Sequence, residues 1–61
     1  MFKEGDRVRI NCPDDFRVHG CTGVILSVSD TDMWPYEVAV RRHVTEQPFK
    51  WVFNLDELEA L

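Results

Sequence analysis

Apolar and polar residues alternate along several short stretches of the chain, which is the pattern of β-strands with one buried face. In Tyr36–Arg42, apolar side chains occupy every second position from Tyr36 to Val40. A second apolar run, Thr22–Val28, precedes it, and the polar stretch Ser29–Pro35 joins the two. We therefore predict that these two runs form a β-hairpin around which the rest of the chain is organised.

The first strand of this hairpin has a mixed pattern. Val24, Leu26 and Val28 share one face, whereas Ile25 requires burial on the opposite side. Gly23 lies where a strand can bend or bulge, because glycine lacks a Cβ atom. We expect a bent strand whose Val24 and Leu26 face is buried.

Two further strands flank the hairpin. Arg7–Ile10 alternates basic and aliphatic residues, and the irregular, polar stretch Asn11–His19 after it predicts a long loop. Phe49–Phe53 directs its aromatic side chains to one face, and we expect them in the core because a short chain needs large side chains to fill its interior. The predicted core comprises Val8, Ile10, Val24, Leu26, Val38, Val40 and Trp51.

The C-terminal stretch predicts a short turn and a last strand. Asn54 and Glu57 have the spacing of a capping box, which favours one helical turn. Glu59–Leu61 can pair as a short final strand. At 61 residues the chain forms one all-β domain of about five antiparallel strands.

Charge argues against a generic nucleic-acid-binding protein, because 11 acidic and 7 basic residues give a net charge of −4. The basic residues nevertheless gather on strand-like runs and could form a basic face. No apolar run approaches the length of about 20 residues that a membrane span needs, and the N-terminus does not resemble a signal peptide. We therefore expect a cytoplasmic protein. The candidate nucleic-acid-binding residues are Arg7, Arg9, Arg41, Arg42 and Lys50.

The cysteines and histidines do not predict a catalytic or metal site. Cys12 and Cys21 flank the long loop and are expected to be reduced in a chain without an export signal, although a bridge between them would clamp that loop. Together with His19 and His43 they offer zinc-type ligands, but not at a standard zinc spacing. We expect neither a cofactor nor enzymatic activity.

Binding is the more plausible chemistry, and the loops carry its candidates. A tryptophan beside a proline at a hairpin tip either covers the open end of a barrel or contacts a partner. With the aromatic and acidic residues of the first loop it could form a groove for a protein partner. The candidate partner-binding residues are Asp14, Asp15, Phe16, Met33 and Trp34.

The order of these features resembles the SH3-like barrels. The group that it resembles contains photosystem I reaction-centre subunit IV, the variable chain of ferredoxin–thioredoxin reductase and the β subunit of nitrile hydratase, and similar short sequences occur in bacterial and phage proteins. The matching residues are Gly5, Val8, Arg9, Ile10, Pro13, Asp14, Phe16, Gly23, Ser27, Val28, Tyr36, Val38, Val40, Arg41, Phe53, Asp56, Glu57 and Leu58.

The resemblance implies a small SH3-like barrel with one short 3-10 turn near the C-terminus. It also implies a non-catalytic accessory or adaptor module that docks on a larger protein or complex, of which a phage or bacterial regulator would be one form. The alternative is a nucleic-acid-binding module of the KOW type that uses the basic strand face. We favour docking, with Phe16 and Trp34 expected to matter more than Arg41 and Arg42.

Overall fold

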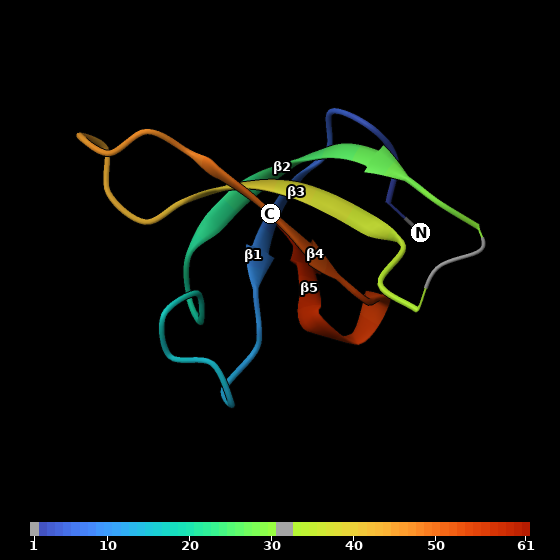
Figure 1. Ribbon diagram of the computed structural model, residues 1–61, viewed down its shortest axis with the longest axis horizontal. Helices are drawn as coiled ribbons and strands as arrows, with labels where there is room; N and C mark the ends of the chain where they lie inside the picture. The colour runs from blue at the N-terminus through green and yellow to red at the C-terminus, as the bar shows by residue number, and fades with distance from the viewer. Residues whose placement is uncertain (1, 31–32) are drawn as a thin grey trace.

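The computed structural model describes residues 2–30 and 33–61 as an all-β fold (Figure 1). All neighbouring strands are antiparallel, in one five-stranded sheet of order β4-β3-β2-β1-β5. A 3-10 turn, η1, lies between the last two strands. The elements are β1 (Arg7–Ile10), β2 (Thr22–Val28), β3 (Tyr36–Arg41), β4 (Phe49–Phe53), η1 (Leu55–Glu57) and β5 (Leu58–Ala60).

The predicted positions of the strands are confirmed, with differences of one residue at three ends. β3 ends at Arg41 rather than Arg42, because the chain turns away there into the β3–β4 loop. β5 begins at Leu58 and ends at Ala60, one residue earlier than predicted at both ends, because Leu58 is buried and pairs with Ile10 of β1.

The core lies on one face of the sheet, which we call the inner face. The predicted burial of Val8, Ile10, Val38 and Val40 is confirmed. Leu58 and Val18, from β5 and the β1–β2 loop, cover the same face. The buried core residues of the described chain are Val8, Ile10, Val18, Ile25, Tyr36, Val38, Val40, Phe53 and Leu58.

The predicted burial of Val24 and Leu26 is wrong, since both are more than a third exposed. β1 and β3 place Gly23 opposite Val8 and Val40, and directly paired residues share a face, so the odd positions of β2 point inward. A Cβ atom on Gly23 would lie 2.6 Å from the Ala39 carbonyl oxygen, so only glycine permits this close approach of β2 and β3.

A β-bulge near the end of β2 brings Val28, rather than Ser27, onto the inner face, where it pairs with Tyr36. Ile25 pairs with Val38, but the next pair is Ser27 with Glu37, so Leu26 is the extra residue. The sequence shows this bulge only as three successive apolar residues, which do not reveal the face that each one takes.

The predicted burial of Trp51 in the core is also wrong. Trp51 pairs with Val38 and so belongs to the inner face, yet it is 48% exposed. The reason is its position on β4, which is an edge strand, at a point where no other element covers it completely.

The C-terminal turn begins as predicted. The backbone N–H of Asn54 donates to Oε1 of Glu57 at 3.0 Å, as in a capping box. Among residues 2–30 and 33–61, no helix has the length and apolar character to cross a membrane.

Candidate docking groove

A groove opens between the β1–β2 loop and the inner face of β4. Its volume is about 190 Å³, and charged side chains surround a floor of aromatic and aliphatic ones. The groove is lined by Asp15, Arg17, Val18, Arg42, Phe49 and Trp51.

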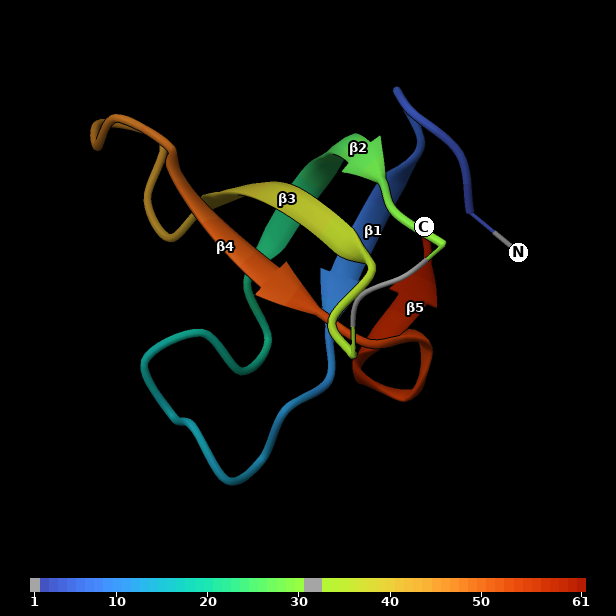
Figure 2. The ribbon, with the colours of Figure 1, turned by 45° about the vertical axis from the view of Figure 1, so that its right-hand side comes forward.

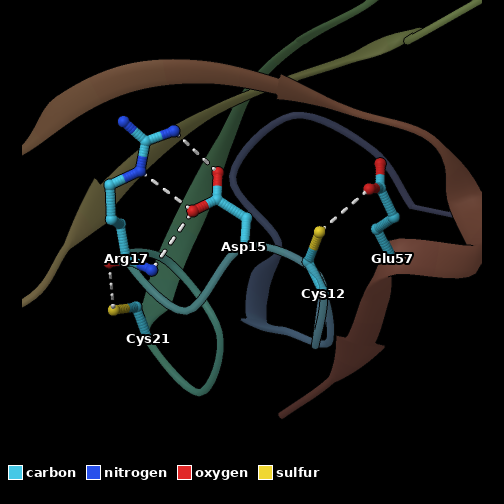
Figure 3. A network of polar contacts seen from close by, with 5 residues as sticks. All are labelled: Cys12, Asp15, Arg17, Cys21 and Glu57. Atoms are coloured by element: carbon cyan, nitrogen blue, oxygen red, sulfur yellow. Dashed lines mark hydrogen bonds and ion pairs between the residues drawn. The ribbon is translucent and has the colours of Figure 1, made fainter.

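One wall of the groove is a loop held in shape by its own contacts (Figure 3). The Arg17 guanidinium donates to both carboxylate oxygens of Asp15, at 3.0 and 3.2 Å. The Asp15 carbonyl accepts hydrogen bonds from the backbone N–H groups of Val18 and His19. The hydrogen bond from Arg17 favours the ionised carboxylate and lowers the pKa of Asp15 below its ordinary value. Val18 is buried and anchors the loop on the core, which gives the groove a defined edge.

The opposite wall is aromatic and carries a second ion pair. The Arg42 guanidinium carbon lies 5.4 Å from the centroid of the Phe49 ring, a cation–π distance. Its Nε donates to Oε2 of Glu46 at 3.2 Å. Trp51, half exposed, lies two residues along β4 from Phe49. Such a surface can receive an apolar side chain between paired charges.

The residues predicted to bind a partner are divided between two loops. Asp15 lines the groove, and Asp14 and Phe16 lie beside it in the same loop, with Phe16 88% exposed. Met33 and Trp34, exposed by 80% and 50%, belong to the β2–β3 loop, which lies apart from the β1–β2 loop in both ribbon views (Figures 1 and 2). No described cavity is lined by both loops.

Most of the predicted basic residues meet on the outer face of the sheet, which is opposite the core. A hollow of about 330 Å³ opens there between Arg7 and Arg41. No acidic side chain among the described residues forms an ion pair with Arg7, Arg9, Arg41 or Lys50. Strand register arranges the face in rows, one of Arg7, Val24, Ala39 and Lys50 and the next of Arg9, Thr22 and Arg41.

Arg42 is separate from this basic face. It directly follows β3 and packs on Phe49 in the groove. The pattern of the sequence grouped it with Arg41, but the structure gives the two neighbouring arginines different surroundings.

The two thiols are unbridged and point to different groups (Figure 3). Cys12 donates its S–H to Oε2 of Glu57 at 3.2 Å, and its backbone N–H donates to Nδ1 of His19. Cys21 lies 3.9 Å from the carbonyl oxygen of Arg17. Partial burial, and then the Glu57 carboxylate, raise the pKa of the Cys12 thiol above its ordinary value.

This contact gives a test of the β1–β2 loop. Glu57→Gln should lower the pKa of Cys12, because the neighbouring negative charge is lost while a side-chain oxygen remains to accept from Asn54. In a Cys21→Ser background, where Cys12 is the only thiol, the pH midpoint of alkylation by iodoacetamide should move down. An unchanged midpoint would show that Glu57 does not contact the thiol.

No three histidine, cysteine or acidic side chains gather as metal ligands among the described residues. His43, the remaining predicted candidate, lies in the β3–β4 loop, where its backbone carbonyl accepts from Glu46.

Sequence reasoning missed Arg17, Val18, Phe49 and Trp51 as residues of a site. The available signal was the aromatic stripe of β4 itself, since an aromatic residue on an edge strand is not fully enclosed. No protein-family model matches the chain, and no curated protein matches it significantly.

Proposed function

We propose that this chain is a non-catalytic SH3-like module that docks on a larger protein through the groove between the β1–β2 loop and β4. The observation that carries the proposal is Trp51, a large aromatic side chain left half exposed beside Phe49 and flanked by charged residues. The residues that contribute most to binding energy in protein interfaces are enriched in tryptophan and lie in apolar pockets surrounded by a polar rim. Phe16, on the adjacent loop, extends this surface.

The fold supports the same proposal. Five antiparallel strands with a 3-10 turn near the C-terminus are the architecture that the resemblance to accessory SH3-like subunits implies. Such subunits act by binding a protein that holds the active site, and a bacterial or phage regulator fits this description. A cytoplasmic setting, where thiols stay reduced, belongs to the proposal.

The chemistry of Cys12 supports a non-catalytic role. A nucleophilic cysteine needs a lowered pKa and a base that accepts its proton. The pKa of Cys12 is instead raised, and its thiol contacts a carboxylate. Nδ1 of the neighbouring His19 accepts from a backbone N–H rather than from the thiol.

Affinity capture from the native host tests the proposal. The baits are the unchanged chain, Trp51→Ala and the double variant Arg7→Ser, Arg41→Ser, each first shown to be folded. A protein retained by the unchanged chain and by the arginine variant, but lost with Trp51→Ala, is the expected result. Proteins captured equally by all three baits would contradict docking at the groove.

A second candidate function rests on the outer face. The hollow between Arg7 and Arg41, with Arg9 and Lys50 nearby, offers cations that no described acidic side chain pairs. They fit the phosphates of a nucleic acid, as the KOW-type alternative requires. Glu37 and Glu59 lie on the same face by register and reduce its positive charge, so we rank this function second.

The second function makes a separate prediction. Binding to an RNA or DNA oligonucleotide should weaken steeply with salt, and Arg7→Ser with Arg41→Ser should reduce the slope of log K against log salt by about 1–2. Fluorescence anisotropy at several salt concentrations measures this slope. Binding that does not change with salt would exclude the basic face as a phosphate site.

A further inference from the structure

Among residues 2–30 and 33–61, no strand lies beside one long edge of β4. β4 pairs with β3 alone and ends the sheet, so half of its backbone groups face away from the ladder. Outside the ladders, the backbone hydrogen bonds between described residues include none to residues 49–53. An uncovered edge of this kind is a template for another strand.

The register of the sheet determines which residues face that edge. The N–H of Ile10 donates to the Cys21 carbonyl, and the N–H of Ile25 donates to the Asp6 carbonyl. The backbone groups of even-numbered residues in β1 therefore point to β2, and those of odd-numbered residues in β2 point to β1. The backbone groups of the even-numbered residues Thr22 and Val24 must then point to β3, where Val24 pairs with Ala39.

The same alternation continues into β4. Because the backbone N–H and C=O groups of Ala39 point to β2, those of Val38 and Val40 point to β4. There, Val38 pairs with Trp51 and Val40 with Phe49. The backbone groups of the intervening residues, Lys50 and Val52, therefore point out from the free edge.

Both sides of this edge are hollow. The docking groove lies on the inner side, and a second hollow of about 220 Å³, lined by Glu37, Lys50, Trp51 and Val52, also borders β4. Trp51 lines both, so it lies at the rim of the edge. An extended segment laid along β4 would send alternate side chains into the two hollows.

We propose that the partner adds an extended segment to β4 as a sixth strand, and that apolar and acidic residues alternate in that segment. The inference rests on the proposed function and names its mode of binding. The apolar side chains meet Phe49 and Trp51 in the groove. The acidic side chains meet Lys50, which lies on the edge strand itself and forms no ion pair among the described residues. Glu37 also lines this second hollow, but it lies on β3, one strand further from the added segment, and accepts a hydrogen bond from Ser27.

Charge favours such a segment over a second copy of this chain. Pairing of β4 with another β4 brings a second Lys50 to the same short edge, where like charges oppose each other. An acidic segment instead supplies the opposite charge.

A synthetic peptide of about seven residues in which valine and glutamate alternate is the probe. We expect binding with a Kd of about 1 mM or below, together with slowed hydrogen exchange at the Lys50 and Val52 amides. Two N-methylated peptides, each methylated at one set of alternate residues, provide the control. The N–H groups of one set point toward β4, so the peptide methylated at that set should bind about tenfold more weakly. The peptide methylated at the other set should bind normally. Equal binding of both methylated peptides, or no binding at this concentration, would overturn strand addition.

The captured partner then separates this inference from the proposed function. Val52→Pro removes an outward N–H and no ladder bond, while Val52→Ala keeps that N–H and serves as the matched control. We expect Val52→Pro to weaken binding of the partner by about tenfold and Val52→Ala to leave it unchanged. If both variants bind normally and Trp51→Ala does not, docking stands and strand addition fails. If Trp51→Ala also binds normally, both fail.

Discussion

Replacing Ile25 by alanine should destabilise the domain by about 2–5 kcal/mol, which is the usual cost of truncating a fully buried aliphatic side chain. Ile25 is 2% exposed and packs in the centre of the inner face. A chain of 61 residues has a total stability of only about 3–9 kcal/mol, taking about 0.05–0.15 kcal/mol per residue. The loss is therefore a large share of the total stability, and urea denaturation followed by tryptophan fluorescence measures it.

Leu26 provides the matched control, because it is the next residue and takes the opposite environment. It is the extra residue of the β2 bulge and is 38% exposed. Leu26→Ala should cost about 1 kcal/mol or less. If Leu26→Ala were the more damaging change, β2 would present its other face to the core and the register described above would be wrong.

Replacing Trp51 by alanine should weaken binding of the partner by about 2 kcal/mol or more, which raises Kd by about 30-fold. The indole is the largest exposed apolar group of the groove and lies two residues from Phe49 on the same strand. Burial of its exposed half on docking supplies the expected free energy. Isothermal titration of the purified partner measures the change.

Two apolar side chains outside the groove serve as controls for Trp51→Ala. Val44 is 86% exposed in the β3–β4 loop, and Trp34 is half exposed in the β2–β3 loop. Val44→Ala should bind normally. Loss of binding with Trp34→Ala alone would place the interface on the β2–β3 loop, where the sequence also predicts a contact.

The positions of the strands could be predicted because each strand needs only a local pattern. Alternation of apolar and polar residues indicates β1, β3 and β4 without any knowledge of their neighbours. The inward face of β2 could not be predicted in this way. It depends on the pairing of Gly23 with Val8 and Val40, and on a bulge that only the register across two strands reveals.

The groove could be predicted only in part, because it joins residues of the β1–β2 loop to residues of β4 that lie more than 30 positions later. The acidic and aromatic residues of the β1–β2 loop were recognised as a binding candidate, and Asp15 lies on the wall of the groove. The sequence predicts a buried Trp51, because its alternation with Phe53 is that of a buried face. Its exposure follows from the edge position of β4, which is a property of the whole sheet.

The side-chain indole signals of the two tryptophans test the docking site most directly. Each tryptophan reports on one candidate surface in a ¹⁵N-labelled sample, Trp51 on the groove and Trp34 on the β2–β3 loop. On addition of the captured partner, the Trp51 indole signal should shift or broaden more than any other side-chain N–H signal. An unchanged Trp51 signal, with changes confined to Trp34 or to the guanidinium signals of Arg7 and Arg41, would contradict docking at the groove.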